Sequence, residues 1–120
     1  MKKVKIAFFD SKPYDIDSFN ELNSEHDFEI KYFKFHLTND NILLAQGYDV
    51  VVVFVNDTVN AEMILKLKEY GVKLIALRSS GFNNIDLKAA LNKIRVVRVP
   101  AYSPHAIAEH TVALMLTLNR

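Results

Sequence analysis

A run of six apolar residues, Val50-Val-Val-Val-Phe-Val55, most constrains the fold of this 120-residue chain. Apolar and polar side chains do not alternate in the run, so a strand at this position must be covered on both faces. Strands covered in this way are typical of parallel sheets, whose crossover connections place helices on either side. We therefore expect an α/β domain built around a parallel sheet.

Strand and helix patterns alternate along the remainder of the chain. Strands are predicted at residues 4–9, 28–33, 50–55, 73–77 and 95–99. Helices are predicted at residues 15–25, 39–46, 60–70 and 86–92, with Thr38 as an N-cap and Gly47 and Gly71 just beyond two helix ends. With right-handed crossovers, this order predicts a flavodoxin-like, doubly wound, parallel five-stranded sheet.

The final segment predicts a long C-terminal helix over residues 104–119. Ser103 is a favourable N-cap and Pro104 suits the first helical position. Apolar side chains occupy nearly every face of this helix, whereas a surface helix carries one apolar stripe. We therefore expect the helix to be buried between two bodies. In this chain alone, the side chains from Ile107 to Leu118 are expected to form a homodimer interface.

Composition disfavours several classes of function. The formal net charge is +1 and the basic residues are dispersed, which argues against nucleic-acid binding. The chain has no cysteine, so disulfides and thiolate zinc sites are excluded, and a cytoplasmic location is expected. No membrane span is expected, because no apolar run approaches about 18 residues. No metal site is predicted either, since His105 and His110 fall on different faces of the final helix.

Candidate ligand-binding residues lie in the loops that follow the strands, because ligands of open parallel sheets bind at the carboxyl ends of the strands. The loop Arg78-Ser-Ser-Gly-Phe-Asn-Asn-Ile-Asp86 contains one glycine before a predicted helix start, an arrangement that can direct backbone N–H groups at a small carboxylate. Alternatively, Gly81 only supplies a turn and Asp86 only caps a helix. With three glycines in all, the chain cannot contain a G-x-G-x-x-G dinucleotide loop.

Two motifs together resemble one enzyme family. The loop of residues 78–86 and the segment Val96-Val-Arg-Val-Pro-Ala-Tyr-Ser-Pro-His-Ala-Ile-Ala-Glu-His110 are similar to the amino-terminal part of D-isomer-specific 2-hydroxyacid dehydrogenases. The resemblance implies that residues 1–102 form the substrate-side lobe and residues 103–120 an interdomain helix leading to an absent NAD-binding Rossmann domain. It also implies NAD-dependent interconversion of a small 2-hydroxy acid and its 2-keto acid, with D-lactate and pyruvate as the nearest pair.

The resemblance assigns roles to individual residues. Backbone N–H groups of Ser80 and Gly81 would bind the substrate carboxylate, and Ser80 would also contact the cofactor. Tyr102 would reach into the active site, and Phe54 would form an apolar wall beside the substrate's methyl end. The family's catalytic arginine, glutamate and histidine follow later in the chain order, so residues 1–120 are predicted to contain no catalytic residue and to be inactive in isolation.

Two other functions remain open from the residues alone. A phosphoacceptor receiver domain has nearly the same length and fold, and would use Asp10, Asp57 and Ser80 after three strands. That chemistry also needs an adjacent acidic pair for Mg²⁺ and a lysine after the fifth strand, and the sequence provides neither. A non-enzymatic, NAD-sensing member of the dehydrogenase family is the other alternative.

Overall fold

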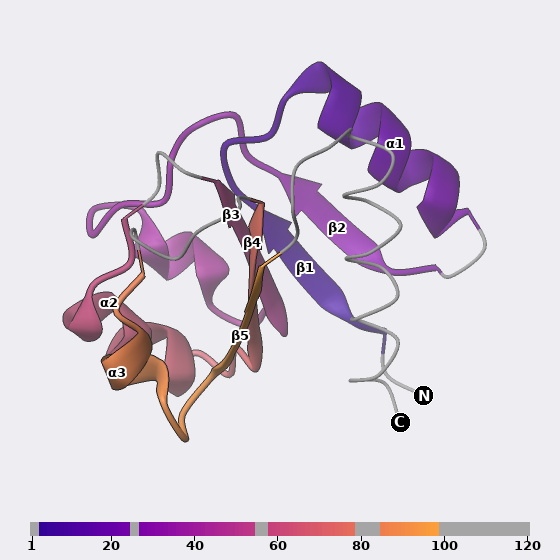
Figure 1. The fold of residues 1–120 in the computed structure, drawn as a ribbon. Helices are drawn as coiled ribbons and strands as arrows, with labels where there is room; N and C mark the ends of the chain where they lie inside the picture. The colour runs from indigo at the N-terminus through magenta and orange to yellow at the C-terminus, as the bar shows by residue number, and fades with distance from the viewer. Residues whose placement is uncertain (1–2, 25–26, 55–57, 79–84, 99–120) are drawn as a thin grey trace.

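The computed structural model describes residues 3–24, 27–54, 58–78 and 85–98. Over these residues, strands and helices alternate around one sheet, as Figure 1 shows. The strands are β1 (Lys5–Phe8), β2 (Glu29–Tyr32), β3 (Val50–Phe54), β4 (Leu74–Arg78) and β5 (Arg95–Arg98). The helices are α1 (Pro13–Asn23), the short 3₁₀ helix η1 (Ile42–Ala45), α2 (Ala61–Glu69) and α3 (Leu87–Ala90).

The sheet has five strands in the order β2-β1-β3-β4-β5, and every neighbouring pair is parallel. All five strands lie where the sequence predicts them, within a residue or two at either end. The order is that of a flavodoxin-like sheet, so the predicted fold class is confirmed. The direction of winding reverses between β1 and β3, and the carboxyl edge at this switch point is where such folds bind ligands.

Strand β3 runs through the centre of the sheet and is covered on both faces, as its apolar run predicts. Val51 and Val53 pack in the core cluster that includes η1, α2 and α3, whereas Val50 and Val52 pack in the cluster that includes Phe19 of α1. All four valines are fully buried. Figure 1 shows α1 on one side of the sheet and α2 and α3 on the other.

Local polar contacts define where the helices begin and end. Helix α1 starts with Pro13 in the first position, and the backbone N–H of Lys12 donates to the side chain of Asp15, which is half of a capping box. Asn60 and Asp86 cap α2 and α3 through bonds from the Met63 and Ala89 N–H groups. Gly47 and Gly71 adopt φ values of +87° and +94° just beyond η1 and α2, as predicted.

The predicted α-helix at residues 39–46 is wrong: the structure has only the four-residue η1 there, and Thr38 is not its N-cap. Asn41 occupies the N-cap position, where its side chain accepts from the Thr38 N–H and donates to the His36 carbonyl. Of the four η1 residues, Ile42 and Ala45 are buried and the two leucines between them are exposed. This three-residue period suits a single 3₁₀ turn.

The predicted C-terminal helix lies outside the described residues. Within the described part of the chain, no helix is both long and apolar enough to cross a membrane.

Candidate functional site

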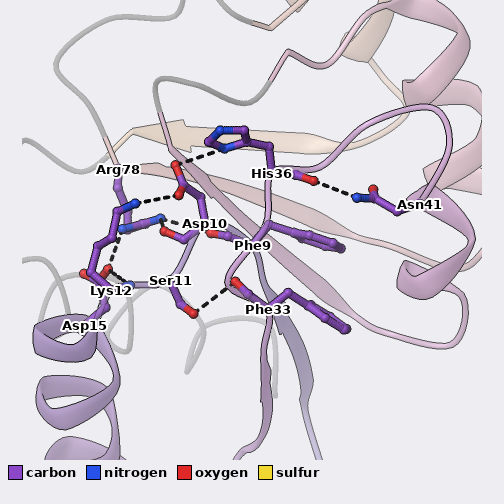
Figure 2. A network of polar contacts seen from close by, with 9 residues as sticks. All are labelled: Phe9, Asp10, Ser11, Lys12, Asp15, Phe33, His36, Asn41 and Arg78. Atoms are coloured by element: carbon purple, nitrogen blue, oxygen red, sulfur yellow. Dashed lines mark hydrogen bonds and ion pairs between the residues drawn. The ribbon is translucent and has the colours of Figure 1, made fainter.

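The carboxyl ends of three neighbouring strands meet at the switch point of the sheet. Strand β1 continues into Phe9 and Asp10, β3 ends at Phe54, and β4 ends at Arg78, which is paired with Phe54 in the sheet register. Figure 2 shows that side chains from β4, from the β1–α1 connection and from the segment after β2 converge on Asp10. This edge is therefore the candidate site.

Arg78 is a fully charged side chain in the interior of the molecule, with 1% of its surface exposed. Its Nη1 lies 2.8 Å from Oδ2 of Asp15, which is itself 0% exposed. Its Nη2 donates to the carbonyl oxygens of Phe9, at 3.0 Å, and Asp10, at 2.8 Å. Such a buried charge is tolerated only when it is paired and hydrogen-bonded, so Arg78 joins β4, α1 and the β1–α1 connection into one unit.

Two aromatic rings lie against the same guanidinium. The Arg78 Cζ atom is 4.6 Å from the ring centroid of Phe8 and 4.6 Å from that of Phe54. Phe8 is fully buried, whereas Phe54, at the end of β3, is partly buried. A planar guanidinium makes favourable contacts with aromatic faces, so Arg78 also connects the ends of β1 and β3.

Asp10 holds its carboxylate inward in a left-handed backbone conformation, with a φ of +52°. Its side chain is 1% exposed, and its two oxygens lie 2.8 Å from Lys12 Nζ and 3.3 Å from His36 Nδ1. The Asp10 N–H donates to the Phe35 carbonyl, which together with the Arg78 bond holds the backbone in this strained region. Asp10 is thus a structural anchor at the edge, and Lys12 and His36 present partly exposed cationic or ionisable groups there.

The pKa values of two groups near the site, Lys12 and Tyr32, are raised. The hydrogen bond to Asp10, and then its negative charge, raise the pKa of Lys12. Burial, reinforced by the charge of Asp15, raises the pKa of the Tyr32 hydroxyl at the end of β2, and this hydroxyl donates to Asn20 Oδ1 at 3.0 Å. Both shifts favour the protonated form, so Lys12 stays charged and Tyr32 stays neutral over the physiological range.

The structure places only part of the sequence-predicted site. Phe54 is the last residue of β3 and so lies at the carboxyl edge of the sheet. Ser80, Gly81, Tyr102 and Asp57 lie outside the described residues. Of the loop's boundary residues, Arg78 belongs to β4, and Asp86 caps α3, which is the structural role that the sequence left open for it.

Neither Asp15 nor the buried role of Arg78 is predicted from the sequence. The sequence does contain a signal, because Arg78 ends the strand Leu74-Ile-Ala-Leu-Arg78, whose four preceding residues are all apolar. In the structure all five residues of this strand are buried. An arginine that continues such a strand needs a carboxylate partner. The sequence does not say which of the chain's acidic residues supplies it.

The described residues do not fit a bound dinucleotide or a metal ion. The two glycines among them, Gly47 and Gly71, precede β3 and β4 and so lie at the opposite, amino edge of the sheet, where they cannot form a phosphate loop at the site. In residues 3–24, 27–54, 58–78 and 85–98, no three His, Cys, Asp or Glu side chains are grouped so that they could hold a metal.

Comparison with known proteins gives one consistent result. The family model described as D-isomer specific 2-hydroxyacid dehydrogenase, catalytic domain, matches residues 6–119. A 2-hydroxyacid dehydrogenase homolog of Haemophilus influenzae is 48% identical over 98% of this chain and 36% of its own length. The apo-structure of D-lactate dehydrogenase from Escherichia coli superposes with a TM-score of 0.78 at 45% identity, over 98% of this chain and 38% of that one.

A second similar structure was solved with a cofactor. It is the NAD-complexed form of a D-isomer specific 2-hydroxyacid dehydrogenase from Lactobacillus delbrueckii subspecies bulgaricus, with a TM-score of 0.74 at 36% identity, covering 96% of this chain and 35% of that one. The chain spans about a third of the length of the curated relatives it matches.

Proposed function

We propose that this chain, which belongs to the family of D-isomer specific 2-hydroxyacid dehydrogenases, is the substrate-side lobe of an NAD-dependent D-lactate dehydrogenase. The observation that carries the proposal is the match to the catalytic domain of that family over residues 6–119. The fold supports it, because Phe54 lies at the carboxyl edge of the sheet, where such folds bind ligands. In this proposal residues 1–102 bind the substrate, and residues 103–120 form a helix that connects to a cofactor domain.

The lobe contributes binding and orientation rather than chemistry. Backbone N–H groups at Ser80 and Gly81 hold the carboxylate of the 2-hydroxy or 2-keto acid, and the Tyr102 hydroxyl contacts its polar end. Phe54 excludes water beside the substrate's methyl group. Fixing the substrate in this way lowers the barrier by orientation, which is the usual contribution of positioning residues.

NAD supplies the hydride chemistry when it is bound. Because the described residues do not fit a dinucleotide, we propose that most of the cofactor is bound by a domain outside this chain, with only Ser80 contacting it from this lobe. The acid–base histidine and the substrate-binding arginine are proposed to lie outside the chain as well. Residues 1–120 alone are accordingly proposed to be inactive.

The decisive experiment is an NADH oxidation assay with the full-length protein that carries this chain. Pyruvate should be reduced with multiple turnovers, and the product should be the D enantiomer when it is separated on a chiral column. The purified chain of residues 1–120 serves as the matched control and should give no rate above background. A full-length protein that binds NADH but reduces none of a panel of 2-keto acids would instead support the NAD-sensing alternative.

The proposed role of Tyr102 has its own test. Tyr102→Phe removes one hydroxyl and little packing, so kcat/KM for pyruvate should fall by the equivalent of about 1–3 kcal/mol in transition-state binding, as for one lost buried hydrogen bond. The melting temperature should not change. Unchanged kinetics would assign Tyr102 a purely structural role.

Two further proposals concern the environment of the protein. The apolar segment from Ile107 to Leu118 is proposed to form the contact of a homodimer, because its side chains would otherwise forgo burial. The absence of cysteine is compatible with a reducing cytoplasm, which we propose as its location.

A further inference from the structure

We propose that Arg78 is a specificity-determining residue, which sets the size of the substrate side chain that is accepted by holding the Phe54 ring in place. The inference rests on the proposed function, since it takes Phe54 to be the wall beside the substrate's side chain. Arg78 itself would touch no substrate atom, so its role is that of a positioning residue.

The guanidinium of Arg78 is held in place by partners on several sides. Asp15 holds Nη1 at 2.8 Å, the Phe9 and Asp10 carbonyls hold Nη2, and the fully buried Phe8 ring lies 4.6 Å from Cζ. These partners come from β1, the β1–α1 connection and α1, so the plane of the guanidinium is fixed by three elements of the fold. A charge held in this way in a 1% exposed side chain has one orientation available to it.

Phe54 lies at the end of its strand and is only partly buried. A phenyl ring in such a position would ordinarily sample several rotamers, because fewer neighbours restrict χ1 and χ2. Here the Arg78 Cζ lies over the ring at 4.6 Å, and the two residues are paired across β3 and β4. The fixed cation therefore selects the orientation of the ring, and with it the shape of the wall.

Lysine cannot replace arginine in this role. Its ammonium can still pair with Asp15, but it offers a compact point charge with three donors instead of a plane with a fixed fork. Arg78→Lys therefore keeps the buried charge while it removes the planar guanidinium whose Cζ lies 4.6 Å from the Phe54 ring centroid. Phe54→Leu removes the ring itself and leaves the Arg78 network to Asp15 and the carbonyls in place.

The experiment measures kcat/KM of the full-length protein for pyruvate and for phenylpyruvate, a 2-keto acid with a much larger side chain. Phe54→Leu is expected to change the ratio of kcat/KM for phenylpyruvate to kcat/KM for pyruvate by about tenfold. This is the size of effect that one altered contact in a substrate pocket produces. Arg78→Lys should change the ratio in the same direction by threefold or more, and the double variant should go no further than Phe54→Leu. The matched control is Arg95→Lys, an exposed arginine on β5, which should leave the ratio unchanged.

An exclusively structural Arg78 would give a different result. Arg78→Lys would then lower the melting temperature, and both kcat/KM values in equal proportion, without altering their ratio, and that outcome overturns the inference. The inference is also overturned if Arg78→Lys changes the ratio of the two kcat/KM values equally in the wild type and in Phe54→Leu. The two residues would then act independently.

Poor folding of Arg78→Lys would not prevent the test. Asp15→Asn combined with Arg78→Gln removes both buried charges together and should change the ratio as Arg78→Lys does. A well-folded double-neutral variant with the wild-type ratio overturns the inference. Failure of the proposed function is distinguishable, because the wild-type protein would then reduce neither keto acid.

Discussion

Removing one member of the Asp15–Arg78 pair should destabilise the chain far more than removing both charges. Arg78→Gln leaves the 0% exposed Asp15 carboxylate without its cation, and Asp15→Asn leaves the 1% exposed guanidinium without its anion. Breaking a buried pair in this way typically reduces stability by about 3–5 kcal/mol. In the double variant neither group is charged, so its loss of stability should be well below the sum of the two single losses.

The contacts of the two residues refine the expected values. Arg78→Gln also weakens the bonds to the Phe9 and Asp10 carbonyls, so it should fall at the upper end of the range. In Asp15→Asn the side-chain oxygen of the new amide can still accept from the Lys12 N–H. Its NH₂ group can take the place of Oδ1, which has no hydrogen-bond partner in the described part of the chain. The loss of stability in Asp15→Asn should therefore fall at the lower end of the range.

Urea unfolding of the purified chain and its three variants, followed by circular dichroism, measures each free energy of unfolding by linear extrapolation. We expect a coupling energy of about 2 kcal/mol or more between the two sites, in the sense that the double variant is more stable than additivity predicts. Losses that simply add, or an Arg78→Gln variant within about 1 kcal/mol of wild type, would refute the view that this pair holds the carboxyl edge together.

Three other predictions concern pH dependence, substrate binding and assembly. The raised pKa values of Lys12 and Tyr32 contribute stability that is complete below their ordinary values of 10.5 and 10.0 and is lost as pH rises through the folded-state values. Lys12→Met and Tyr32→Phe should therefore each flatten the alkaline decline of the melting temperature. An equal decline with pH in the wild type and both variants would contradict this. Gly81→Val should weaken binding of oxamate by the full-length protein more than Ser80→Ala does, since a β-branched residue does not readily adopt a positive φ, and equal affinities would remove the carboxylate-loop role. Sedimentation should show the isolated chain as a dimer or larger species through residues 107–118, and a monomer at high concentration would disprove that interface.

The sequence by itself determined the strands and the class of fold, because both depend on local patterns. The unbroken apolar run in β3 is a direct consequence of helices on both faces of the sheet, and the glycines after η1 and α2 are required by their positive φ. The position of Phe54 at the carboxyl edge follows from the same local pattern, since it ends a strand. The exception is the 39–46 segment, where a three-residue burial period gave a single 3₁₀ turn.

Only the tertiary structure decided which side chains meet at that edge. Asp15 and Arg78 are 63 residues apart, and Asp10 and His36 are brought together by parallel pairing of β1 with β2. From the sequence alone, any of several acidic residues could pair with the positive charge of Arg78. The choice of Asp15 depends on how α1 packs across the ends of the strands, because a buried charge is stabilised by the distance and orientation of its partner, and neither is encoded locally.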